Sequence, residues 1–219
     1  MKPFSPQFLF FLETMLLASV IFMYLTRKNF KVIFFYTIQS LIISISLFYS
    51  SLIETSFLLM AAAIMTFLVK VIAAPFFFLR FIKKHRLQFS VSTYLNGPMT
   101  LIVLALLIAF PYSHFFKPLA AISPGNKDAL LLSMSMIFVS IFLTVNRKGA
   151  LSQMVGILSM ENAIVSFAYV SGLETTAGAQ AGILFIIFIW IIIASVFASM
   201  IYHYFGSLDV SKMKHLKEE

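Results

Sequence analysis

Two residues of this sequence have side chains that can carry charge or protons, yet each stands inside a long apolar run. Lys70 lies ten residues before Arg80, which is about 15 Å along a helix axis. Glu161 lies near the middle of the run between Gly149 and Gly172. Inserting such a side chain at the centre of a membrane helix costs about 2.5–3.5 kcal/mol. Lys70 and Glu161, at similar depth on different helices, are therefore the first candidates for chemistry.

A buried carboxyl beside a lysine admits two interpretations. Burial favours the protonated form of Glu161, and a nearby ammonium group favours the ionised form. A carboxyl balanced between these effects can take up and release a proton near neutral pH, as a proton relay requires. The alternative is a permanent ion pair that fixes helix packing. We favour transport, because ionisable groups inside membranes are usually functional. Equal depth does not show that the two residues touch.

Four polar residues follow one face of the predicted helix that carries Glu161. Spacings of three, four and three residues place them on a single stripe: Ser159, Asn162, Ser166 and Tyr169. The stripe could hold ordered water that leads to the carboxyl, or it could pack hydroxyls and small side chains against another helix. Both interpretations stay open, and Asn162 joins the predicted ion pathway.

Three other residues in apolar runs are worth naming. Pro75 has no N–H to donate to the carbonyl of Val71, so a helix kink is predicted beside Lys70. It is either a hinge that water can reach or an ordinary kink. Gln39 is predicted to make an interhelical hydrogen bond and is a further candidate for the pathway. Glu13 lies in the outer third of the first run, from where it can reach the membrane interface, so a functional role is not favoured for it.

The composition excludes a soluble domain. Hydrophobic residues make up 61% of the chain and charged residues 11%, whereas soluble domains carry roughly 25% charged residues. The net charge of +8 comes from short clusters between apolar runs, which indicates membrane topology and no nucleic-acid partner. The lipid bilayer is the predicted environment.

Several kinds of chemistry lack the residues they need. The sequence has no cysteine, so disulfides, thiolate-bound clusters and cysteine nucleophiles are excluded. It has no phosphate-binding loop and no dinucleotide-binding glycine turn. The histidines lack metal-ligand spacing. We therefore expect no catalytic centre, no cofactor site and no metal site in this chain.

Seven apolar stretches are long enough to cross a bilayer as helices, which takes about 20 residues. The predicted fold is an all-α polytopic membrane protein. Alternate connections hold 12 of the 16 Lys and Arg residues, so the positive-inside rule predicts an external N-terminus and a cytoplasmic C-terminus. Pro111 is expected to kink or end the fourth span. The predicted spans are 7–26, 31–50, 55–79, 97–117, 128–146, 151–172 and 179–204.

Four segments are distinctive in their order and spacing: Phe35-Tyr36-Thr37-Ile38-Gln39-Ser40-Leu41, Lys70-Val71-Ile72-Ala73-Ala74-Pro75, Gly156-Ile157-Leu158-Ser159-Met160-Glu161-Asn162 and Gly206-Ser207-Leu208-Asp209-Val210. With these segments the chain resembles the hydrogenase-4 component E family over nearly its whole length. Members of this family are similar to membrane subunits of group 4 nickel–iron hydrogenase and formate hydrogenlyase-type complexes. These complexes are relatives of respiratory complex I and of Mrp-type antiporters.

The last three predicted spans resemble the small three-helix K subunit of complex I and its counterpart in Mrp antiporters. In the K subunit a Gly-Leu-Glu-Leu-Met-Leu-Asn run places a carboxylate in the middle helix. Alignment on Gly156 and Asn162 puts that carboxylate at Leu158, one helical turn from Glu161. The resemblance therefore implies that Glu161 takes over this role.

The resemblance has one gap. A second carboxylate is present in the last helix of the K subunit, whereas residues 179–205 contain no Asp or Glu. A second carrier is then expected from Lys70, from Gln39 with water, or from a neighbouring subunit.

The resemblance implies a membrane-arm subunit of a hydrogenase-type, complex I-related oxidoreductase in a bacterial or archaeal inner membrane. Residues 1–127 would form a four-helix region, 128–205 the K-like region and 206–219 a cytoplasmic tail. The chain would contribute to proton or sodium translocation coupled to electron transfer. The NiFe centre and iron–sulfur clusters would belong to partner subunits, and antiporter-like membrane subunits would be neighbours. The alternatives are a structural scaffold and a subunit of a Mrp-type cation/proton antiporter.

Overall fold

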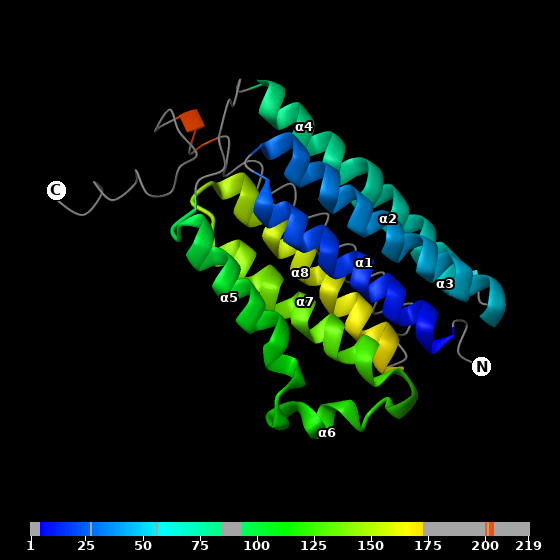
Figure 1. Cartoon of the computed structure of the whole chain (residues 1–219). Coiled ribbons are helices and arrows are strands. Elements are labelled where there is room, and N and C mark those ends of the chain that lie inside the picture. The colour runs from blue at the N-terminus through cyan, green and yellow to red at the C-terminus, as the bar shows by residue number, and fades with distance from the viewer. Residues whose placement is uncertain are drawn as a thin grey trace.

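The computed structural model describes residues 5–26, 28–55, 57–84, 93–172, 200 and 202–203. These residues are mostly helical and contain no strand, and one isolated antiparallel bridge joins Thr93 to Arg147. The long helices lie side by side in an elongated bundle (Figure 1). The predicted all-α fold class is confirmed for this part of the chain.

The first two helices form an antiparallel pair. α1 (Pro6–Leu25) begins at Ser5, whose hydroxyl accepts a hydrogen bond from the Phe8 N–H at 3.3 Å. A proline at the first helical position suits this start, because no partner is needed there for the missing N–H. α2 (Asn29–Glu54) packs along α1. Both helices match predicted spans, and α2 is longer than predicted at either end.

The third long element changes its backbone pattern part of the way along. α3 (Phe57–Thr66) is followed by η1 (Phe67–Ala73), a π-helix, and by α4 (Ala74–Lys84). π-helices are rare and form with bonds to the fifth preceding residue, and the Ala74 N–H donates to the Val69 carbonyl in this way. The kink predicted at Pro75 stays a prediction. The backbone irregularity that precedes this proline is a π-helical segment, and it contains Lys70.

The fourth predicted span is interrupted near Pro111, as the sequence predicts. α5 (Gly97–Ala109) begins at Asn96, whose side chain accepts the Met99 N–H at 3.1 Å. It ends just before Pro111, which has no N–H for the helical ladder and whose ring would clash with the preceding turn. A bend of 43° separates the helical segments on the two sides of Ser113. The short elements after α5 are η2 (Phe110–Tyr112), η3 (His114–Phe116) and α6 (Lys117–Ala120).

The last two described helices agree with the predicted spans to within one residue at each end. After η4 (Pro124–Asn126) come α7 (Lys127–Asn146) and α8 (Ala150–Ser171). α8 ends at Gly172, whose φ of 74° is a left-handed conformation that glycine adopts without steric cost. The predicted seventh span, 179–204, and the tail from 206 lie outside the described residues, apart from Met200, Tyr202 and His203.

The described helices suit a lipid environment. Five of them are long and apolar enough to cross a membrane, or six if the bent α5–α6 region forms one span. Large apolar side chains also point outward along the bundle, as Phe57, Leu106 and Phe115 do. A helix that is apolar on every side is typical of a membrane span. The chain is therefore described as a multi-pass membrane protein.

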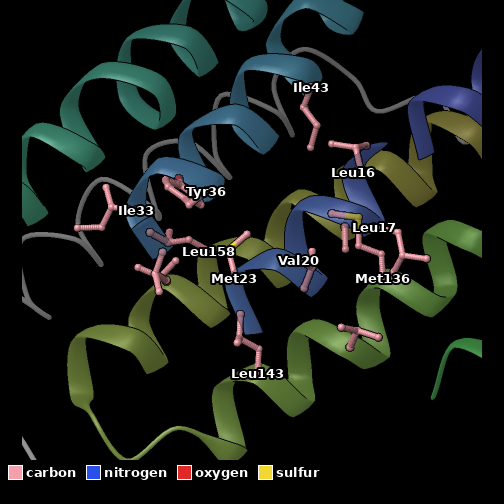
Figure 2. Packing of buried hydrophobic residues seen from close by; sticks show 14 of the residues in the cluster. Leu16, Leu17, Val20, Met23, Ile33, Tyr36, Ile43, Met136, Leu143 and Leu158 are labelled. Carbon is pink, nitrogen blue, oxygen red and sulfur yellow. The ribbon is translucent and has the colours of Figure 1, made fainter. Parts of the chain in front are cut away.

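One apolar core joins the early and the late helices. α7 and α8 form the most extensive helix pair, α1 packs on α7 and α2, and α2 also packs on α8. Figure 2 shows Val20, Tyr36, Met136 and Leu158, from these four helices, directed into the shared interior. In Figure 1, α3 and α4 lie on the far side of α2, and α5 lies on the far side of α7. α1, α2, α7 and α8 are thus the elements that surround the buried polar side chains.

Candidate functional site

Lys70 and Glu161 form a buried ion pair between η1 and α8. The Lys70 Nζ donates to Glu161 Oε2 and, at 3.0 Å, to Asn162 Oδ1. The Lys70 side chain is 1% exposed and that of Glu161 is 17% exposed. The second carboxylate oxygen, Glu161 Oε1, is buried and has no partner among the described residues. The pair therefore neutralises the charges while one carboxylate oxygen stays unbonded.

Asn162 extends the ion pair toward α2. Its Nδ2 donates to Ser40 Oγ at 3.0 Å and to Gln39 Oε1 at 3.3 Å. Gln39 Nε2 in turn approaches Met136 Sδ at 3.9 Å, on α7. The structure thus brings together all four residues that the sequence predicts for the pathway. They come from three elements that are far apart in the chain, and only Glu161 is more than marginally exposed.

The backbone that carries Lys70 is itself irregular. In a π-helical pattern, the N–H of Pro75 would serve the carbonyl of Lys70, five residues earlier, but proline has no N–H. The same residue would serve the Val71 carbonyl in an α-helical pattern. One carbonyl next to the ion pair therefore lacks its helical hydrogen bond in either pattern. π-helical turns are frequent at functional sites.

The polar stripe of α8 is confirmed as one face, and each of its members bonds to another helix. Ser159 Oγ lies 3.1 Å from Ser140 Oγ of α7. Ser166 donates to Glu13 Oε1 of α1, and Tyr169 Oη lies 2.8 Å from Ser50 Oγ of α2. With Asn162, the stripe makes polar contacts with α1, α2 and α7, which all pack on α8. These direct bonds support the packing interpretation of the stripe.

Glu13 is the buried polar residue that sequence reasoning misplaces. The expectation that it reaches the interface is wrong, because its side chain is 3% exposed inside the bundle. It shares a buried face of α1 with Leu9, Leu16 and Val20, spaced by four, three and four residues. This spacing is a usable signal in retrospect. It is hidden in the sequence because the other faces of α1 are almost equally apolar, so no contrast marks the inner one.

Arg147 lies at the end of the bundle where α1 ends and α8 begins. It is 1% exposed, and its guanidinium donates to the carbonyls of Met23, Tyr24 and Thr26 at the C-terminal end of α1. Its Cζ also lies 5.5 Å from the centre of the Tyr24 ring. Burial lowers the pKa of Arg147 to about 10, which still leaves the residue charged at neutral pH. In the sequence it is one loop charge among others, but in the structure it caps a helix.

The polar contacts form an ordered series along the bundle axis. From the end that contains Ser50 to the end that contains Arg147, it runs through Ser50–Tyr169, Glu13–Ser166, the Lys70 cluster, Ser140–Ser159 and Arg147. The region around Lys70 and Glu161 lies near the middle of this series. The described residues contain no cluster of three His, Asp or Glu side chains that would bind a metal ion.

Comparisons with protein-family models, with curated proteins and with solved structures found no match to this chain.

Proposed function

We propose that this chain is a membrane-arm subunit of a hydrogenase-type, complex I-related oxidoreductase, and that it contributes to ion translocation through Glu161. The observation that carries the proposal is the buried pair of Lys70 and Glu161 in the middle of an apolar bundle, bonded onward to Asn162 and Gln39. Replacing such a pair by apolar residues of similar size is often neutral or stabilising. Stability alone therefore gives little reason to keep it.

The translocated ion in this proposal is the proton. Lys70 already neutralises the Glu161 carboxylate, so the pair has no net negative charge with which to hold a sodium ion. A proton, in contrast, adds directly to a carboxylate oxygen, and Glu161 Oε1 has no partner among the described residues. Sodium is then the alternative that a test must exclude.

Protonation of Glu161 changes the forces on Lys70. The carboxylate loses its charge, and the ammonium keeps only neutral acceptors, the Glu161 Oε2 and the Asn162 Oδ1. An unpaired ammonium in a low-dielectric interior is costly. Uptake of a proton at Glu161 therefore favours movement of Lys70, or arrival of a new negative charge near it. Glu161 is the proton carrier in this scheme, and Lys70 sets when the carrier is loaded.

The π-helical segment gives Lys70 room to respond. A change between π- and α-helical hydrogen bonding shifts the register of one residue, and Pro75 prevents either pattern from being complete. Movement of Lys70 toward or away from Glu161 thus needs no rupture of an ideal helix. Pro75 is proposed as the source of this local flexibility.

The membrane orientation follows from the basic connections. With seven spans and an external N-terminus, the end that contains Ser50 and Tyr169 faces outward and the Arg147 end faces the cytoplasm. The NiFe centre and iron–sulfur clusters are assigned to partner subunits. Antiporter-like membrane subunits are the expected neighbours in a bacterial or archaeal inner membrane.

The test uses the native complex in membrane vesicles. Glu161→Gln keeps the shape of the side chain but removes the titrating group, so we expect electron transfer without proton translocation. Asp128→Asn is the matched control, because Asp128 is an exposed carboxylate in the first turn of α7. Electron transfer and vesicle acidification are measured on the same preparation, with and without sodium. Normal acidification by the Glu161→Gln complex contradicts the proposal.

The bonds made by every member of the α8 stripe favour a second candidate, a structural scaffold with a permanent ion pair. Exchange of the two charges, Lys70→Glu with Glu161→Lys, separates the candidates. A scaffold regains both assembly and coupling in the exchanged variant. A carrier regains assembly only, because the carboxyl now lies on another helix. Mass spectrometry of the purified complex tests the remaining alternative, since a Mrp-type antiporter brings no redox subunits.

A further inference from the structure

Among the described residues, Glu13 differs from Glu161 in having no cation beside it. Its Oε1 accepts a hydrogen bond from the Ser166 hydroxyl, and its Oε2 is buried without a partner among the described residues. The only salt bridge within those residues joins Lys70 to Glu161. The described interior around Glu13 thus offers one hydrogen bond donor and no counter-charge.

A carboxylate in this place is expensive if it is ionised. Removal of a charge from water costs several kcal/mol when no partner compensates it. A protonated carboxyl avoids this cost, because it needs only to accept from Ser166 and to donate one hydrogen. A residue kept only for packing would be cheaper as Leu or Gln at the same position. The chain instead retains a group that can hold a proton inside the bundle.

The position of Glu13 connects it to the Lys70 cluster. Ser166 belongs to the α8 stripe and lies five residues from Glu161, about 7.5 Å along the helix axis. In the proposed pathway, one or two water molecules would bridge that gap. On the other side, Tyr169 and Ser50 lie toward the end of the bundle. Glu13 therefore stands between that end and the central ion pair.

We infer that Glu13 is a second proton carrier, which passes its proton to Glu161 along the Ser166 side of α8. This inference rests on the proposed function and supplies the second carboxylate from within the chain. Before the step, the Ser166 hydroxyl turns its hydrogen from Glu13 Oε1 to a water molecule, and the protonated Oε1 donates to Ser166 Oγ instead. The Oε1–H bond of the Glu13 carboxyl then breaks, and its proton goes to Ser166 Oγ. Ser166 gives its own hydroxyl proton to water, and the water gives a proton to Glu161 Oε1. Glu13 ends as a carboxylate and Glu161 as a neutral acid, so charge and protons balance.

The proposed proton transfer accounts for the different surroundings of the Glu13 and Glu161 carboxyls. Lys70 is bonded to Glu161, whereas no cation among the described residues pairs with Glu13, so the proposed transfer starts from a neutral Glu13 and a paired Glu161. Proton transfer leaves a charged Glu13 that must be reloaded from the side of Ser50 and Tyr169. It also releases Lys70 from its pair. After each transfer, therefore, Glu13 has to take up a new proton and Lys70 has to find a new position.

The experiment compares Glu13→Gln with Glu13→Asp in the native complex in membrane vesicles. Glu13→Gln keeps the hydrogen bond from Ser166 but cannot carry a proton, so we expect translocation to fall about 100-fold, the size of a positioned proton donor's contribution. Glu13→Asp keeps a carboxyl and is expected to restore part of the rate. Infrared difference spectra during turnover should show a protonated carboxyl band that disappears in Glu13→Gln and persists in the Asp128→Asn control.

The outcomes separate this inference from the proposed function. Loss of coupling in Glu161→Gln with full coupling in Glu13→Gln overturns the role of Glu13 alone. Full coupling in both variants overturns the proposed function as well. An equal loss in Glu13→Gln and Glu13→Asp, with no change in the carboxyl band, assigns Glu13 a packing role and contradicts the inference.

Discussion

Gly156 of α8 lies against Thr144 of α7 so closely that no side chain fits between the two helices. A Cβ atom on Gly156 would come within 2.5 Å of Thr144 Oγ1 and within 3.0 Å of the Thr144 backbone. Thr144 Oγ1 is itself held by a hydrogen bond of 3.0 Å to the Ser140 carbonyl. This contact sets the spacing of α7 and α8, and Glu161 lies five residues farther along α8. The position of the central carboxyl thus depends on a glycine that has no chemistry of its own.

Gly156→Ala is therefore expected to lower the free energy of unfolding by about 1–3 kcal/mol, the usual cost of overpacking. Backbone atoms cannot move aside as a flexible side chain does, so α7 and α8 must separate. Thermal unfolding followed by far-ultraviolet circular dichroism in lipid nanodiscs measures the effect. Gly149→Ala is the control, because its Cβ would meet only Ser152 Oγ at 3.9 Å. Equal midpoints for the two variants would refute the close contact.

Substitution of Lys70 alone should lower the free energy of unfolding more than substitution of both Lys70 and Glu161. Lys70→Met leaves Glu161 buried without a cation, and breaking a buried pair in this way costs about 3–5 kcal/mol. Adding Glu161→Gln removes the uncompensated charge, so we expect most of that stability to return. A double-mutant cycle from the same unfolding curves gives the coupling free energy. Strict additivity of the two substitutions would mean that the residues do not interact.

Replacement of Pro75 should raise the stability of the protein and lower the rate of proton translocation. Pro75→Ala supplies an N–H for the carbonyl of Val71 or Lys70 and removes the ring clash, which favours a regular α-helix over the π-helical segment. We expect a higher unfolding midpoint and slower proton translocation at unchanged electron transfer. Pro98→Ala serves as the comparison, since Pro98 lies in the first turn of α5, where a proline costs nothing. Unchanged translocation in Pro75→Ala would remove the proposed flexibility from the mechanism.

Arg147 should resist conservative replacement. Arg147→Lys keeps the charge, but one ammonium group cannot reach all the carbonyls of Met23, Tyr24 and Thr26 that the guanidinium bonds. We expect a loss of about 2 kcal/mol, in the range for hydrogen bonds to charged groups. Lys148→Arg is the control. The Lys148 Nζ lies 5.2 Å from the Tyr94 ring centre, a contact that either an ammonium or a guanidinium group can make. A larger loss at Lys148 than at Arg147 would contradict the cap.

The helical elements follow from the sequence wherever an apolar run is uninterrupted. α7 and α8 match their predicted spans within a residue, because loop residues and Gly172 mark their ends. The fourth span is predicted to kink or end at Pro111, and this is confirmed, because α5 ends at Ala109 and a bend of 43° follows at Ser113. The π-helical segment before Pro75 is not predicted, because hydropathy does not distinguish α-helical from π-helical hydrogen bonding. The span 179–204 and the external N-terminus stay predictions.

Depth in the membrane is what the sequence determined about the candidate site. A helix rises by a constant 1.5 Å per residue, so counting from loops places Lys70 and Glu161 at one level. Direction around each axis was decided only by tertiary structure. Lipid is as apolar as leucine, so the hydrophobic effect does not choose which face of such a helix points inward. Only packing brings Lys70 to Glu161 and Asn162, places Glu13 against Ser166, and closes Arg147 over the end of α1.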